Sequence, residues 1–245
     1  MNWIELCVLA VAIFAAACLQ ASIGFGMGML VAPVLAVIEP QLVPGTIIVL
    51  ALFLTTMVTV RERHSLDLHG AAWALVGRLP GSIAGAWLVV TIPADGLAWL
   101  VAAVVLGGVL MAFLGWAPHP GRRNLVIAGA ASGLMGTSTS IGGAPMAIVW
   151  QGLHGSQLRG TMSAFFLVGT TMSFFALLAS GALDTQIVRV AALMLPAVLG
   201  GYLVSRLVNR TLDRRRLRLT ALTASASGAV LVIIVQLASL TGGPM

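Results

Sequence analysis

The chain is a succession of long apolar segments that are almost free of charged side chains. Ten segments can be recognised, and most approach the roughly 20 residues that a helix needs to cross a bilayer. Only 8% of the 245 residues are charged and 59% are hydrophobic, whereas soluble domains carry about 25% charged residues. We therefore predict an all-α polytopic membrane protein and exclude a disordered chain, a disulfide-rich secreted module and a nucleic-acid-binding domain. The segments are 3–20, 23–38, 45–60, 70–92, 96–116, 124–138, 141–153, 160–181, 186–208 and 219–240.

In each half of the chain, the first two segments are short and are joined by small residues. The first joint, 22–28, has glycine at positions 24, 26 and 28, and the second, 136–143, combines glycine with serine and threonine. The other six segments have the composition of ordinary spans. The sequence therefore predicts about eight to ten membrane segments, because each broken pair either spans fully or is re-entrant.

The two halves resemble each other in order and spacing. Matching positions are 112 to 117 residues apart throughout, and the ordered series is more persuasive than any single match. We therefore predict a duplication, with a first membrane repeat at 1–118 and a second at 119–245 that together form one membrane domain. The clearest matches are Gly24 with Gly136, Pro33 with Pro145, 55–57 with 170–172, and Pro80 with Pro196.

The loops carry their arginines very unevenly. When loops are assigned alternately to two sides, one side holds eleven arginines and the other only Arg189. The positive-inside rule makes the arginine-rich side cytoplasmic and places both termini outside. The loop containing Asp67 is then inside, whereas its repeat counterpart containing Asp184 is outside. The two halves are therefore predicted to be inverted in the membrane, as in many secondary transporters.

The two glycine-rich breaks are the predicted substrate site. Broken helices from both halves of an inverted repeat meet near the midplane, and glycine lets a ligand approach the backbone closely. The helices after the breaks are expected to begin near Met29 and Ala144, and a helix N-terminus attracts anions. Pro145 suits a first turn, whereas Pro33 is expected to lie a turn deeper and kink its helix. The candidate substrate-binding residues are Gln20, Ser22, Gly24, Gly26, Gly28, Gly136, Thr137, Ser138, Thr139, Ser140, Gly142 and Gly143.

Other interpretations of these residues remain open at this point. Small residues also allow close helix packing, which is the better explanation of one break alone but not of two matched breaks with clustered hydroxyls. Arg78, the basic residue set deepest in a segment, is a further candidate for binding the anion. The alternative interpretation is that the Arg78 side chain snorkels to the cytoplasmic headgroups. Thr55 and Thr170 either line the path or bond back to their own helices.

The motifs at the breaks resemble those of the sulfite exporter TauE/SafE family, within the 4-toluene sulfonate uptake permease superfamily. Residues 24–33 are similar to its first signature, and 132–136 followed by 141–145 are similar to its second. The resemblance covers nearly the whole chain. It implies a permease of the cell inner membrane that moves small sulfur-containing anions such as sulfite or sulfonates. Met27 and Met29 interrupt the first glycine pattern, and this departure leaves the substrate open.

The leading hypothesis is a secondary transporter that works by alternating access, and the alternative is a selective anion or solute channel of the same architecture. An enzyme is not expected, because the segments show no nucleophile paired with a base and no set of metal ligands. We also expect no cofactor, no metal and no nucleic-acid partner. The expected partners are the small anion and the lipid bilayer. The sequence leaves open the coupling ion, proton or sodium, the direction of transport, and the oligomeric state, a homodimer included.

Overall fold

The computed structural model describes residues 1–113, 119–153 and 155–211, together with the isolated positions 223, 230, 233, 234 and 237. Predicted segment 219–240 and the basic residues beyond position 211 lie outside the described ranges. Within these ranges the regular structure is entirely helical, as predicted. The elements are α1 (Trp3–Ile23), α2 (Met27–Ile38), the 3₁₀ turn η1 (Pro40–Leu42), α3 (Gly45–Arg61), α4 (Leu68–Thr91), α5 (Ala94–Phe113), α6 (Arg122–Thr139), α7 (Gly143–Val149), α8 (Gly155–Ala179) and α9 (Thr185–Thr211).

Both predicted breaks are present, and the backbone explains where they fall. α1 starts with a capping box between Asn2 and Glu5 and ends at Gly24, whose φ of 97° is left-handed. Gly26, at φ 121°, precedes α2. α6 ends at Ser140, whose φ of 64° is unusual for a residue with a side chain. Positive φ favours glycine, so residues 24 and 26 are glycines for a conformational reason.

The helices after the breaks begin close to the expected positions. α2 begins at Met27, two residues before Met29, and α7 begins at Gly143, one residue before Ala144. As predicted, Pro145 lies in the first turn of α7, and Pro33 lies inside α2. A helix start is poorly defined in sequence where glycine and apolar residues continue from the break into the first turn.

The predicted apolar segment 141–153 was too long for the helix that forms there. α7 covers only seven residues, and the chain then turns with the Leu153 N–H donating to the Trp150 carbonyl at 2.9 Å. Gly152 and Gly155 follow, the latter at φ 60°. Hydropathy does not detect this end, because Trp150 and Leu153 are apolar although the backbone is already turning.

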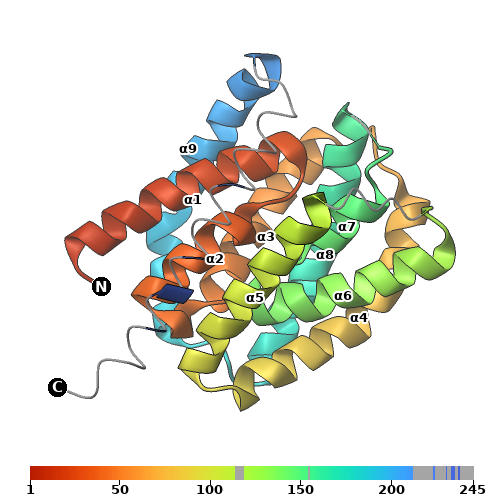
Figure 1. The fold of residues 1–245 in the computed structure, drawn as a ribbon. Coiled ribbons are helices and arrows are strands. Elements are labelled where there is room, and N and C mark those ends of the chain that lie inside the picture. The colour runs from red at the N-terminus through yellow and green to blue at the C-terminus, as the bar shows by residue number, and fades with distance from the viewer. Residues whose placement is uncertain are drawn as a thin grey trace.

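Helices from the first half of the chain pack against helices from the second half (Figure 1). α1 runs along α9, α4 runs along α6, and α3 packs on α8 between them. The α4–α6 contact is close because it is built from glycine: a β-carbon at Gly77 or Gly81 of α4 would overlap backbone carbonyls of α6. Gly129 of α6 faces a carbonyl of α4 in the same way. Small residues thus bring the backbones together, as is common in membrane helices.

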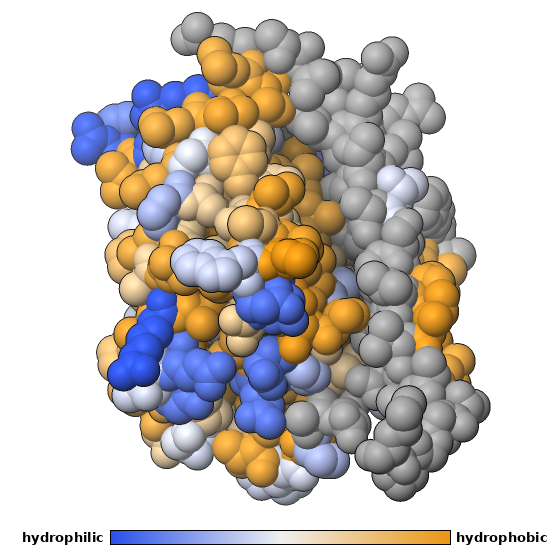
Figure 2. Space-filling model, turned by 90° about the vertical axis from the view of Figure 1, so that its left-hand side faces the viewer, coloured by the Kyte–Doolittle hydropathy of each residue, from blue (hydrophilic) through white to orange (hydrophobic). Residues whose placement is uncertain are grey.

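The outer surface of the bundle is apolar. Four helices of the described ranges are long and apolar enough to cross a membrane: α1, α4, α8 and residues Thr185–Val208 of α9. Large side chains such as Trp3, Val11 and Trp87 are exposed on this surface. Figure 2 shows one face, on which hydrophobic residues cover most of the described area and hydrophilic residues gather in groups. A contiguous apolar surface of this kind is what a lipid-facing protein requires.

Candidate substrate site at the two helix breaks

The two helix breaks lie directly against each other. A β-carbon at Gly28 would overlap the backbone carbonyl of Ser140, and one at Gly143 would lie 3.0 Å from the Phe25 β-carbon. The start of α2 therefore contacts the second break, and the start of α7 contacts the first. Only glycine permits this approach of backbone to backbone. The sequence prediction that the breaks come together is therefore confirmed by their contacts.

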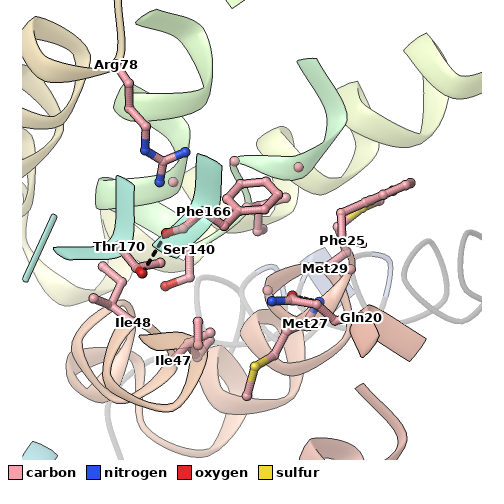
Figure 3. Close-up of a pocket in the computed structure, with 17 residues that line it drawn as sticks. Gln20, Phe25, Met27, Met29, Ile47, Ile48, Arg78, Ser140, Phe166 and Thr170 are labelled. Atoms are coloured by element: carbon pink, nitrogen blue, oxygen red, sulfur yellow. Dashed lines mark hydrogen bonds between the residues drawn. The ribbon is translucent and has the colours of Figure 1, made fainter. Parts of the chain in front are cut away.

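A cavity of about 40 Å³ opens where the breaks meet (Figure 3). It has room for water-sized guests and small ions. Its wall is formed by the ends of the broken helices and by single turns of α3, α4 and α8. The lining residues are Gln20, Phe25, Gly26, Met27, Gly28, Met29, Ile47, Ile48, Ala51, Arg78, Gly136, Ser140, Ile141, Gly142, Gly143, Phe166 and Thr170.

Arg78 enters this cavity from α4. Its side chain is 1% exposed, and Figure 3 shows its guanidinium pointing toward the space above Phe166 and Ser140. Nη1 donates to the Ser132 hydroxyl at 2.8 Å, whereas Nε has no hydrogen-bond partner. The snorkelling alternative is therefore wrong, because the guanidinium lies inside the bundle and does not reach its surface.

Glycines and aromatic rings make room for this arginine. A β-carbon at Gly169 of α8 would overlap the guanidinium, and one at Gly136 would lie 3.3 Å from Nη2. The guanidinium carbon lies 4.8 Å from the ring centroid of Phe165 and 5.3 Å from that of Phe166. Such cation–π contacts are worth about 0.5–2 kcal/mol each. No carboxylate lines the cavity, so its positive charge has no ionic partner among the described lining residues.

Ser132 connects Arg78 to the second break. Its hydroxyl accepts from Arg78 and donates to the Gly142 carbonyl at 2.6 Å. Gln20 has a similar role at the first break, where its Oε1 accepts from the Met27 N–H at 3.0 Å. Sequence reasoning missed Ser132, although the repeat offset of 112 residues pairs it with Gln20 and could have identified it.

Eight of the predicted site residues line the cavity and five do not. The lining ones are Gln20, Gly26, Gly28, Arg78, Gly136, Ser140, Gly142 and Gly143, and the others are Ser22, Gly24, Thr137, Ser138 and Thr139.

The hydroxyls away from the cavity are bonded within the protein. Ser22 donates to the Cys18 carbonyl at 2.7 Å, and Ser138 and Thr139 donate to carbonyls one turn earlier in α6, also at 2.7 Å. Thr137 shares a 2.6 Å hydrogen bond with Ser173. Back-bonding to the preceding turn is the usual state of hydroxyls in apolar helices, and it leaves these groups without a direct part in the cavity wall.

Most of the unpredicted lining residues are apolar. Met27, Met29, Ile47, Ile48 and Phe166 are typical of this group. No sequence signal separates such side chains from ordinary core residues.

Thr170 also lines the cavity, and its hydroxyl bonds back to the Phe166 carbonyl at 2.7 Å. Thr170 therefore both lines the path and bonds back to its own helix, the two interpretations that the sequence left open. Its repeat counterpart Thr55 bonds back to the Ala51 carbonyl at 2.7 Å and is not a lining residue.

A larger cavity of about 630 Å³ lies at the ends of α4, α6 and α7. His69, His119 and Arg122 line it, and the Arg122 guanidinium lies 4.9 Å from the Trp73 ring. Trp150 also lines it.

Trp150, which lines the larger cavity, contacts the aromatic ring that packs on Arg78. Its ring packs edge-on against Phe165 with centroids 5.5 Å apart, and Phe165 lies under the Arg78 guanidinium. Trp150 and Phe165 are 2% and 0% exposed. The two rings therefore form a buried series of contacts from the wall of the larger cavity to Arg78.

The described residues contain no cluster of three histidine, cysteine or acidic side chains that could hold a metal ion. The chemistry available at the breaks is therefore electrostatic: one guanidinium, the polar backbone of two helix breaks, and an apolar wall. This arrangement can bind a small anion.

The comparisons with known proteins agree with this chemistry. The model of the family described as "Sulfite exporter TauE/SafE" matches residues 9–234, which is nearly the whole chain. Neither the curated proteins nor the solved structures gave a significant match. The family match covers both helix breaks and every residue of the central cavity. The chain therefore belongs to the TauE/SafE sulfite exporter family of membrane transporters.

Proposed function

We propose that the protein is a secondary transporter that carries small sulfur-containing anions, such as sulfite or sulfonates, across the cell inner membrane by alternating access. The observation that carries this proposal is Arg78, a buried cation without an ionic partner that faces the junction of two broken helices. Burying a charge costs several kcal/mol unless it is paired. An anion in the cavity would supply the missing partner.

The backbone around Arg78 supports the same ligand. The N-terminus of α2 faces the cavity through Met27, Gly28 and Met29. The first N–H groups of a helix have no intrahelical acceptor, and the helix dipole favours negative charge there. The Met27 N–H already donates to Gln20, so the N–H groups that follow it are the ones left for a ligand. The Arg78 guanidinium lines the cavity and provides further donors besides the Nη1 group that bonds Ser132. An oxyanion has several acceptor oxygens and could satisfy donors from both sides of the cavity at once.

We propose that the two halves, 1–118 and 119–245, are inverted repeats with both termini outside. The packing supports this proposal, because exchanging the halves maps the α1–α9 contact onto the α6–α4 contact and leaves α3 against α8. Topology reporters fused at the C-terminus and inserted in the 61–69 loop should report opposite sides of the membrane. If both reporters lie in the cytoplasm, the inverted arrangement is wrong.

A carrier fits the enclosed central cavity better than a channel does. Trp150 lines the larger cavity and packs on Phe165, which lies against Arg78. In this proposal the pair is the closed barrier that alternating access requires on one side of the site. In proteoliposomes a carrier should saturate with substrate and show counterflow. Ohmic single-channel currents would instead favour the selective channel.

The substrate class can be tested by thermal unfolding of the purified protein. A ligand that binds only the folded state raises its apparent melting temperature. We expect sulfite or a small sulfonate to do so for wild type. The effect should be lost in Arg78→Gln and reduced in Arg78→Lys, which keeps the charge but loses the planar fork. Equal stabilisation of wild type and well-folded Arg78→Gln would remove Arg78 from the site and overturn the proposal.

A further inference from the structure

We propose that the central site accepts a monovalent anion and rejects a divalent one. This inference rests on the proposed function and goes further, because it specifies the charge of the substrate. The starting observation is the composition of the cavity wall: of its seventeen lining residues, Arg78 is the only one with an ionisable side chain. The site therefore offers one full positive charge.

Among the residues that the structure describes, no second cation lines the cavity. The other charged or titratable residues of the helices that form the wall are outside it: Glu5, Cys7, Cys18, Arg61, His69, Arg122, Arg123 and Arg159.

Two of these arginines already have ionic partners. Glu62 accepts from Arg61 at 3.2 Å and from Arg159 at 3.0 Å. Arg61 also donates to the Ala21 carbonyl at 2.7 Å. Both guanidiniums are therefore held at the end of α3 by one shared carboxylate. This trio keeps one net positive charge, but neither arginine lines the cavity.

Magnitudes favour the monovalent ligand. A second negative charge in this cavity would be buried without an ionic partner, which costs several kcal/mol. The N-terminus of α2 could offset only part of this cost, because a helix dipole contributes at most about 2 kcal/mol in partly buried geometries. The rest of the wall adds no charge: Phe25, Met27 and Ile48 are apolar, and the Ser140 hydroxyl donates to the Pro44 carbonyl at 3.0 Å. Gln20 contributes only a neutral amide.

Charge balance also suits a transport cycle. With one monovalent anion bound, the central site is neutral, so the loaded protein rearranges without a net charge at its centre. With a divalent anion the loaded site would carry one uncompensated negative charge. The favoured substrates are therefore hydrogensulfite and small singly charged sulfonates rather than sulfate or fully deprotonated sulfite.

Sulfite allows a direct test, because it changes between monovalent and divalent forms near neutral pH. We would measure its dissociation constant for the intact purified protein under anaerobic conditions at about pH 6 and about pH 8.5, on either side of neutral pH. Methanesulfonate, which stays monovalent, and sulfate, which stays divalent, are the fixed-charge controls. Titrations of Arg78→Gln identify binding that does not use the central site.

We expect total sulfite to bind at least tenfold more weakly at the higher pH, a difference of about 1.4 kcal/mol. Methanesulfonate should bind with the same affinity at both values, and sulfate should bind at least tenfold more weakly than methanesulfonate. If sulfate binds as tightly as methanesulfonate, or sulfite binds more tightly at the higher pH, and this binding requires Arg78, the monovalent inference is wrong while the anion site stands. If none of the three anions binds through Arg78, the proposed function fails and the inference fails with it.

Discussion

Replacing Arg78 by methionine separates a binding role of this residue from a structural one. Methionine is the residue at the repeat-equivalent position, Met194, which is also buried. The substitution therefore gives both halves the same side chain. It removes the ionisable side chain from the wall of the central cavity and keeps an unbranched apolar side chain beside Phe165 and Phe166.

The expected effect on stability follows from the contacts of Arg78. The variant loses the hydrogen bond to Ser132, worth about 1.5–3 kcal/mol for a charged donor, and two cation–π contacts of about 0.5–2 kcal/mol each. The variant no longer buries an unpaired charge, and removing this cost stabilises it by several kcal/mol. A contact between the methionine sulfur and the aromatic rings stabilises the variant by about 0.3–1.5 kcal/mol. Without ligand, the free energy of unfolding should therefore stay within about 2 kcal/mol of wild type.

Anion binding should respond very differently. Losing charged hydrogen bonds worth about 1.5–3 kcal/mol weakens the affinity for sulfite by about 10- to 100-fold. Unfolding would be followed in mixed detergent micelles and binding by calorimetry, with Arg63→Met as the control, because Arg63 is exposed and pairs only with its neighbour His64 in the described contacts. A variant that loses about 3–5 kcal/mol of stability, as when a buried pair is broken, but still binds sulfite normally would refute this reasoning.

Two further predictions concern the breaks and the barrier beside them. Gly28→Ala should abolish anion uptake into proteoliposomes, because its β-carbon would overlap the carbonyl at the second break. The control Gly152→Ala, whose β-carbon would meet no atom within 4 Å, should transport normally. Uptake by the Gly28 variant at the wild-type rate would show that the close approach is not needed. In a cysteine-free background, Thr170→Cys should be protected from a membrane-impermeant thiol reagent applied from the side of the larger cavity. Trp150→Ala should speed this labelling at least tenfold and Trp73→Ala should not; equal rates in the two variants would mean that Trp150 does not form the barrier.

The sequence by itself determined the class of the protein, most of its helices and the position of both breaks. Apolar length and the scarcity of charge are properties of a segment alone, so they predict a membrane helix without knowledge of its neighbours. Glycine at positions 24 and 26 likewise reports a local backbone requirement, which the positive φ values there explain. The end of α7 was harder to predict from the sequence, because Trp150 and Leu153 continue the apolar pattern after the helix has ended.

The tertiary structure alone decided which side chains form the site. Thr137 and Ser138 looked equivalent to Ser140 in sequence, but their hydroxyls are bonded to Ser173 and to a helix carbonyl, and only Ser140 reaches the cavity. The direction of Arg78 was equally undetermined, since an arginine within an apolar helix can snorkel or turn inward. It turns inward because Gly169, from the distant helix α8, leaves the space that its guanidinium fills. Such complementarity exists only after helices far apart in sequence have packed together.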